Sequence, residues 1–121
     1  MDPREFDALV EKALGKIPRR FRRKLSNVAF VVEREPPTPG LLGLYRGRPL
    51  TDRHFGEGFH LPDVITIYQG PHERLAADRT HLEKLLEETV WHEVAHYFGM
   101  DERRVRQAER RRAARRRRRT V

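Results

Sequence analysis

The chain has 121 residues, with 26 lysines and arginines against 18 aspartates and glutamates, a net charge of +8, and no cysteine. A chain of this length forms one domain at most. The lack of cysteine excludes disulfides and thiolate metal ligands and fits a reducing compartment. No apolar run reaches the length of a membrane span, and the acidic N-terminus is unlike a signal peptide. We therefore expect a cytoplasmic protein that makes no membrane contact.

The basic residues are concentrated at the C-terminal end. Residues 103–121 contain 11 arginines and one glutamate, whereas residues 1–102 carry a net charge of −2. We expect a folded domain over residues 1–102 and an arginine-rich tail over residues 103–121, which charge repulsion leaves disordered or loosely helical. The tail, Arg103–Arg119, could contact nucleic acid non-specifically through phosphates. The alternative is a charged extension without a partner.

The first predicted element is an N-terminal helix. The sequence Asp2-Pro3-x-Glu5 has a capping aspartate, a proline in the first turn and an acidic residue three positions after the cap. Gly15 and Pro18 end the helix. The basic segment 18–25 that follows is better explained as a solvated surface than as a phosphate contact.

Three segments have the β-branched and aromatic composition of strands, and they span residues 28–33, 41–45 and 63–68. Within the second segment, Gly43 predicts a close backbone approach or a bulge. The polar segment 51–60, which carries His54 and His60, is the best candidate for a mobile loop near a functional cleft.

The last predicted element of the folded domain is a long amphipathic helix. It follows a short helix expected at residues 71–77, and the capping box Thr80-x-x-Glu83 opens it. Gly99 ends it, where a left-handed residue is favoured. Seven residues at i, i+3, i+4 spacing form its inward-facing stripe: Leu82, Leu85, Leu86, Thr89, Val90, Val94 and Tyr97. Three strands flanked by helices predict a small α+β domain.

The most specific motif of the chain lies in this helix, where residues 92–96 read H-E-x-x-H. Two histidines four residues apart lie about 40° apart around a helix and one turn apart along it, so both can bind one metal ion. Glu93 projects about 100° from His92, beside the position of a metal-activated water. Two imidazoles, a carboxylate base and an open position are what a zinc hydrolase needs. The alternative is a helix whose polar residues pair with other side chains or face water.

Two carboxylates, Asp101 and Glu102, follow the glycine closely. If the chain folds back after Gly99, either carboxylate could complete a ligand set of two histidines and one carboxylate. Asp101 is explained at least as well as the N-cap of a following helix. Glu102 is therefore favoured as the third ligand, with a first-turn acidic residue as the alternative explanation.

The chain resembles the bacterial minimal zincins, a metallopeptidase family with a minimal matrix-metalloprotease-like domain. The similarity covers nearly all of residues 3–105, and besides His92–Gly99 it includes, in order, Phe30-Val31-Val32-Glu33, Leu42-Gly43-Leu44-Tyr45 and Ile65-Thr66-Ile67-Tyr68. The resemblance implies a zincin-like domain in which about three strands pack against an N-terminal helix and the C-terminal HExxH helix. It also implies an acidic third ligand that matches Glu102, where aspartate is usual. By the same resemblance, the strand 63–68 could be an edge strand that pairs with an extended substrate, or else a central core strand.

We therefore expect a monomeric zinc-dependent metallopeptidase that acts on a peptide or protein substrate. His92, His96 and Glu102 would bind Zn²⁺, and Glu93 would act as general base toward the metal-activated water. The alternative is a zinc-stabilised, non-catalytic module that associates with nucleic acid through the tail. Other histidines and tyrosines could be ligands or proton donors, although surface or core roles explain them more simply: His54, His60, His72, His81, Tyr45, Tyr68 and Tyr97.

Overall fold

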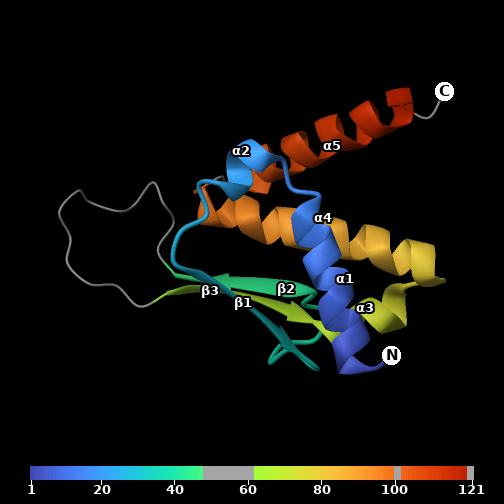
Figure 1. The fold of residues 1–121 in the computed structure, drawn as a ribbon. Coiled ribbons are helices and arrows are strands. Elements are labelled where there is room, and N and C mark those ends of the chain that lie inside the picture. Colours follow the sequence, from blue (N-terminus) through green and yellow to red (C-terminus); the bar gives the residue numbers. More distant parts are fainter. Residues whose placement is uncertain (48–61, 100–101, 120–121) are drawn as a thin grey trace.

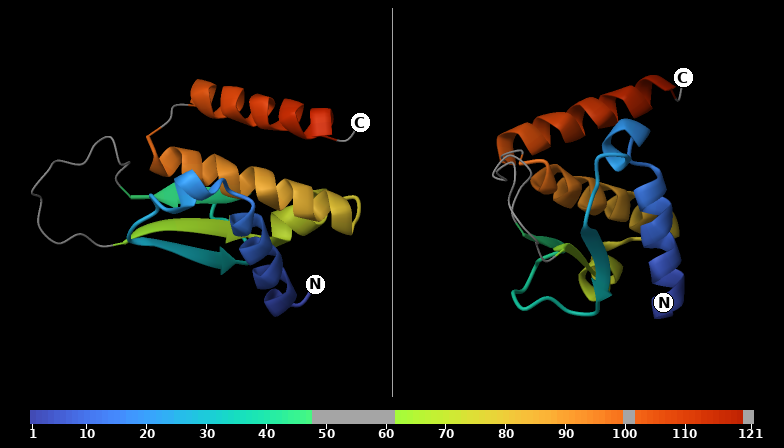
Figure 2. Two further views of the ribbon diagram at one scale, coloured as in Figure 1. Left: turned by 45° about the horizontal axis from the view of Figure 1, so that its top comes forward. Right: turned by 60° about the vertical axis from the view of Figure 1, so that its left-hand side comes forward.

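The computed structural model describes residues 1–47, 62–99 and 102–119 of the chain (Figure 1). The predicted loop 51–60, with His54 and His60, lies outside these residues, as does Asp101. The elements are, in order, α1 (Pro3–Gly15), α2 (Arg19–Arg22), β1 (Val28–Glu33), β2 (Gly43–Arg46), β3 (Asp63–Tyr68), α3 (Gln69–Leu75), α4 (Arg79–Tyr97) and α5 (Glu102–Arg119). A three-stranded sheet lies against a layer of helices, which confirms the predicted α+β fold (Figures 1 and 2).

Helix α1 begins and ends where the sequence predicts. The Asp2 carboxylate accepts a hydrogen bond of 2.8 Å from the backbone N–H of Arg4, and Pro3 is the first helical residue. This cap satisfies one of the N–H groups that a helix leaves unpaired at its start. The buried face of α1 joins the main core and packs against α4; it comprises Phe6, Leu9, Val10 and Ala13.

The sheet has the strand order β1–β3–β2, with β1 parallel and β2 antiparallel to β3. Strand β3 is therefore central. The expectation that residues 63–68 form an edge strand is wrong, and the alternative, a central core strand, is correct. The physical reason is burial, because Ile65, Ile67 and Tyr68 are each 0% exposed and β3 has a neighbour on either side. In the described part of the chain, the edges belong to β1 and β2.

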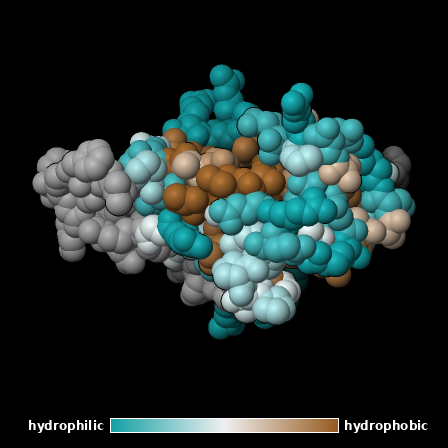
Figure 3. All heavy atoms as spheres, turned by 90° about the horizontal axis from the view of Figure 1, so that it is seen from below, coloured by the Kyte–Doolittle hydropathy of each residue, from teal (hydrophilic) through white to brown (hydrophobic). Residues whose placement is uncertain are grey.

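Strand alternation gives the sheet an inner and an outer face. The register of β1 on β3 places Phe30 opposite Ile65 and Val32 opposite Ile67, and these side chains join the core under α1 and α4. The outer face carries Val31, which is 38% exposed. Figure 3, seen from below the sheet of Figure 1, shows hydrophobic side chains gathered on this side of the molecule.

Helix α4 crosses the inner face of the sheet (Figure 1). Its N-cap is Asp78, whose carboxylate accepts a hydrogen bond of 2.8 Å from the His81 N–H. The predicted start at the Thr80 capping box is therefore wrong. A carboxylate is a good cap acceptor, and its charge is stabilised at the positive end of the helix. The predicted end is confirmed, because Gly99 has φ 79° and its N–H donates to the carbonyl of His96 at 2.9 Å.

Helix α5 lies along α4 on the side away from the sheet (Figures 1 and 2). Ala108 packs against the core, and the Arg112 guanidinium lies 5.7 Å from the centre of the Trp91 ring. Of the two states expected for the arginine-rich segment, the structure has a helix. The division of the chain into a domain and a tail at residue 102 stays a prediction. No helix in the described ranges is both long and apolar enough to cross a membrane.

Candidate metal centre

The two motif histidines face each other on one side of α4. Their Nε2 atoms are 3.1 Å apart and their ring centres 4.8 Å apart. Both side chains are half-buried, at the edge of the stripe that packs on the core. The i, i+4 spacing on a regular helix is what brings the two rings together.

This pair of nitrogens fits a zinc ion. Two ligand nitrogens at the usual zinc distance around a tetrahedral ion are about 3.4 Å apart, close to the 3.1 Å between the Nε2 atoms of His92 and His96. Among the residues that the structure describes, no group of three or more His, Cys, Asp or Glu side chains completes a site. For Glu102 the structure gives a backbone position, as the first residue of α5, but no side chain. The third ligand therefore stays a prediction.

Glu93 is buried between α4 and β2, with 7% of its surface exposed. The absence of a side chain at Gly43 provides the space. A Cβ atom added to Gly43 would lie 3.2 Å from Glu93 Cγ and 2.8 Å from Thr89 Cγ2. The close backbone approach predicted at Gly43 is thus confirmed, and β2 forms one wall around the Glu93 side chain.

His92 and Glu93 line a pocket of ≈380 Å³ between α4 and the segment that leads into β2. Three leucines and one exposed carboxylate complete most of its wall: Leu41, Leu42, Leu85 and Glu88. A concave, largely apolar wall with a few polar groups is typical of a ligand site. The sequence alone did not predict this pocket, because its two walls come from distant segments and the segment before β2 carries no recognisable motif.

The backbone of β2 also directs polar groups away from β3, at a residue that lies next to Glu93. The Tyr68 N–H donates to the Leu42 carbonyl at 3.0 Å, so these two residues form a hydrogen-bonded pair. Hydrogen-bonded and non-hydrogen-bonded pairs alternate along an antiparallel ladder. Gly43, paired with Ile67, therefore directs its N–H and C=O away from β3. These backbone groups lie beside Glu93.

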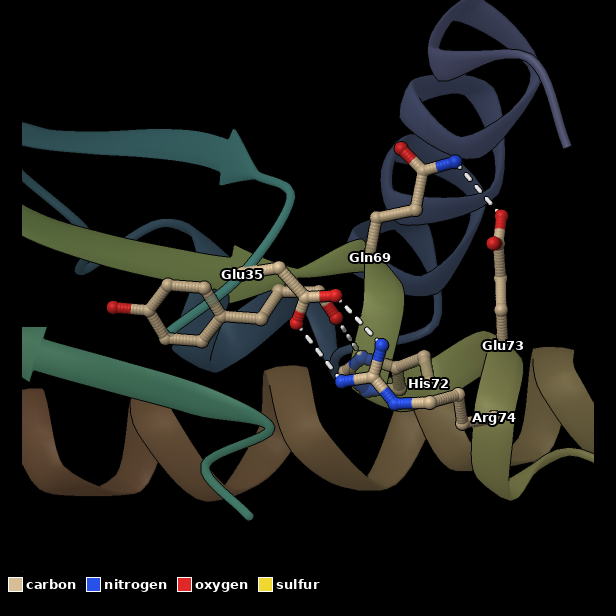
Figure 4. Close-up of polar contacts among 6 residues, drawn as sticks. Glu35, Gln69, His72, Glu73 and Arg74 are labelled. Carbon is tan, nitrogen blue, oxygen red and sulfur yellow. Dashed lines mark hydrogen bonds and ion pairs between the residues drawn. The ribbon is translucent and has the colours of Figure 1, made fainter. Parts of the chain in front are cut away.

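His72, fully buried on α3, has a structural role (Figure 4). Its Nδ1 lies 2.6 Å from the Tyr68 carbonyl oxygen, which can only accept, so Nδ1 carries the proton. Its Nε2 then accepts a hydrogen bond of 2.8 Å from the Thr89 hydroxyl. Burial lowers the pKa of His72, which favours this neutral form. The hydrogen bond fixes Thr89 one turn before Glu93 on α4.

An ion pair holds α3 in place beside this hydrogen bond. The two terminal nitrogens of Arg74 lie 2.6 and 2.8 Å from the two carboxylate oxygens of Glu35, in the segment after β1 (Figure 4). The guanidinium lowers the pKa of Glu35, and the carboxylate raises the pKa of Arg74. Because His72 lies on α3, this forked pair supports the position of its ring.

Three other residues considered as proton donors or ligands have identified partners. Tyr97 is fully buried and donates to the carbonyl of Ser26 at 3.2 Å. Tyr45 donates to the Asp63 carboxylate at 2.7 Å. His81 accepts, through Nδ1, a backbone hydrogen bond of 2.9 Å at the start of α4. These contacts favour the structural explanation of all three residues.

The sequence and the fold are both similar to those of known proteins. The sequence matches the model of the zincin-like metallopeptidases over residues 25–112, a range that contains the three strands, α4 and both motif histidines. Among solved structures, the chain is similar to a conserved hypothetical protein from T. thermophilus, with 29% identity, a TM-score of 0.55 and coverage of 81% of this chain and 94% of the other. No match was found among curated proteins. The chain belongs to the zincin-like metallopeptidase family.

Proposed function

We propose that this protein is a zinc-dependent peptidase in which His92 and His96 bind the metal and Glu93 is the general base. The observation that carries the proposal is the 3.1 Å separation of the two Nε2 atoms beside a buried carboxylate that lines a pocket. Family membership supports both zinc and hydrolysis. We propose Glu102 as the third ligand, with Asp101 as the alternative.

The roles of the protein groups follow from their positions. When bound, zinc supplies a Lewis acid that makes water a nucleophile at neutral pH. The Glu93 carboxylate takes the proton that the attacking water loses and transfers it to the nitrogen of the leaving amine. A carboxylate that acts twice in one turnover has to stay in place, and the packing of Glu93 against β2 restrains it.

The proposed substrate is a peptide in extended conformation. An extended chain can add a strand to a sheet edge, where backbone hydrogen bonds provide affinity and pockets for alternate side chains provide specificity. Gly43 directs its N–H and C=O away from β3, beside Glu93, and the ≈380 Å³ pocket adjoins the same residue. The substrate-pairing role that the resemblance gave to residues 63–68 is therefore assigned to β2.

The test combines metal analysis with peptide hydrolysis. The substitution Glu93→Gln should retain about one zinc per chain and lower kcat by about 10²–10⁴-fold, because the base is lost while the ligands remain. His96→Ala should lose the metal. Glu83→Gln is the matched control, since it makes the same change on α4 at an exposed ion pair with Lys12, and it should leave zinc content and kcat unchanged.

Two results would overturn the proposal. Full activity in Glu93→Gln would remove Glu93 from the mechanism, and unchanged zinc content in His96→Ala would reject the metal site. A wild-type protein that holds zinc but cleaves no member of a peptide library would instead favour the second candidate, a zinc-stabilised binding module. The arginine-rich helix α5 is the feature that favours that candidate.

A further inference from the structure

A strongly basic surface of the described residues is built from two segments near opposite ends of the sequence. One segment is α2 with the residues just after it, and the other is α5. Nine exposed cationic side chains form this surface, the basic face: Arg19, Arg20, Arg22, Arg23, Lys24, Arg103, Arg106, Arg110 and Arg111.

The two segments meet at Trp91 of α4. The Phe21 ring of α2 lies 5.4 Å from the Trp91 ring, and the Arg112 guanidinium of α5 lies 5.7 Å from it. Arg112 also donates a hydrogen bond of 3.4 Å to the carbonyl of Lys16, just before α2. Figures 1 and 2 show α2 and α5 on the side of α4 that faces away from the sheet. The cations of both segments therefore belong to one surface.

The orientation of α5 places cations on its solvent side. At about 100° per residue, Arg103, Arg106 and Arg110 lie within about 60° of one another around the helix. Ala108 and Arg112 lie on the opposite side, where they contact the core and Trp91. The basic face thus has a fixed arrangement on a packed helix, unlike the charges of a disordered tail.

The cations of the basic face form no ion pairs with carboxylates of the described residues. The ion pairs that lysines and arginines of the described residues form involve other cations: Lys12 with Glu83, Lys16 with Glu87 and Arg74 with Glu35. Like charges held close together repel, and a bound polyanion removes this cost.

We propose that the basic face binds the phosphate backbone of double-stranded DNA, without sequence specificity. Arginine forks match phosphate oxygens, and cations that neutralise phosphates release counterions from the duplex. Single strands are usually held by stacking their bases on aromatic side chains. The aromatic residues near the basic face, Phe21, Trp91 and Phe98, pack into the core instead. An α-helix also fits the major groove of B-form DNA better than the deep, narrow groove of A-form RNA.

The test measures the affinity for a short fluorescent B-form duplex at a series of salt concentrations. The logarithm of the binding constant falls linearly with the logarithm of the salt concentration. Each phosphate-binding cation that a variant removes should make this slope shallower by about 0.9. One triple variant changes the segment around α2: Arg19→Gln, Arg20→Gln and Arg23→Gln. A second changes α5: Arg106→Gln, Arg110→Gln and Arg111→Gln. The control makes the same change of charge elsewhere on the surface: Arg4→Gln, Arg34→Gln and Arg79→Gln.

The proposal predicts that each of the first two triple variants lowers the slope by about 2–3, and that the control keeps the wild-type slope. Circular dichroism checks that each variant is folded. An unchanged slope in the α2 variant would contradict the proposal that α2 and α5 bind DNA through one basic face. Tighter binding to single-stranded RNA or to anionic phospholipid vesicles than to the duplex would overturn the choice of partner. The measurement needs neither zinc nor hydrolysis, so its outcome is independent of the proposed peptidase.

Discussion

At the scale of single residues, the hydrogen bond between His72 and Thr89 helps to set the distance between the edge strand β2 and Glu93. His72 Nε2 holds the Thr89 hydroxyl at 2.8 Å, and the Thr89 methyl group then faces β2. Gly43 accommodates that methyl group because it has no side chain of its own. Glu93 follows Thr89 by one turn on α4. One buried histidine and one glycine therefore position the wall against which the proposed base packs.

The substitution Gly43→Ala tests this packing. The new Cβ would lie 2.8 Å from Thr89 Cγ2, and the β-branched threonine is stiff, so α4 or β2 has to shift. We expect a loss of about 1–3 kcal/mol in the free energy of unfolding, measured by urea denaturation. Thr89→Ser removes the methyl group but keeps the hydroxyl, and should restore part of the stability when combined with Gly43→Ala.

The matched control is Gly15→Ala at the end of α1, where an added Cβ meets no atom within 4 Å. Alanine is the better helix former, so this variant should be as stable as the wild type or slightly more stable. If Thr89→Ser leaves Gly43→Ala just as unstable, the contact between these two residues is not the cause.

The buried histidine predicts how stability depends on pH. Burial lowers the pKa of His72 in the folded protein below its unfolded value of about 6.5. Between those two pKa values the unfolded chain binds more protons, so the stability that His72 contributes is present above about pH 6.5 and is lost as the pH falls toward the folded pKa. Each pH unit in this window costs at most about 1.4 kcal/mol.

Urea denaturation from pH 7 to pH 5 of wild type and His72→Asn measures this effect. Asparagine retains an N–H donor and a carbonyl acceptor but does not titrate, so the stability of the variant should fall less over this range. The carboxylates with lowered pKa values, Glu35, Glu73 and Glu83, lose their contribution at lower pH, below about 4.3. If the stability of the two proteins falls equally between pH 7 and pH 5, His72 is not the cause of the pH dependence.

At the scale of the elements, local patterns were enough to predict α1, β1 and β3 with their observed bounds. Their caps, periodicity and breakers lie within a few residues of each other. The second strand begins two residues later than predicted, at Gly43, because its pairing with β3 defines it and the composition of its own segment does not. The central place of β3 could not be predicted in the same way, since strand order depends on contacts between distant segments.

The start of α4 offers a direct comparison of two capping candidates. Asp78→Ala removes the acceptor of the His81 N–H and should lower the free energy of unfolding by about 1 kcal/mol. Thr80→Ala, the control, changes the exposed residue that the sequence pattern favoured and should have little effect. Thermal unfolding of the two variants checks this difference. A larger loss of stability in Thr80→Ala than in Asp78→Ala would show that the Thr80 capping box starts the helix after all.

At the scale of the whole molecule, part of the candidate site depends on local sequence alone, and part depends on contacts between distant segments. The placement of His92, Glu93 and His96 follows from one helix, and the sequence therefore predicts it. The pocket and the outward-facing backbone of Gly43 depend on the path of residues 40–43, which no motif indicates. Helix α5 was equally hard to foresee, because it has few apolar residues with which to dock.

Among the described side chains of α5, Arg112 as well as Ala108 contributes to docking on α4. Trp91 is 6% exposed and is covered by Phe21 and Arg112. A guanidinium over an indole ring contributes about 1–2 kcal/mol when it is partly desolvated. The aliphatic stem of an arginine also covers apolar surface, which the single methyl group of an alanine is too short to do. A helix that is mostly arginine can therefore pack on this side of α4.

Because Trp91 is the single tryptophan of the chain, its fluorescence reports on the position of α5. We expect Arg112→Ala to shift the emission of Trp91 to longer wavelength and to lower the midpoint of thermal unfolding, since water reaches the ring once the guanidinium and its stem are gone. Arg111→Ala, at the exposed neighbouring position, is the control and should change neither quantity. An unshifted spectrum in Arg112→Ala would mean that α5 is held by other contacts. In that case, the shared surface of α2 and α5 would have to be tested by its binding properties alone.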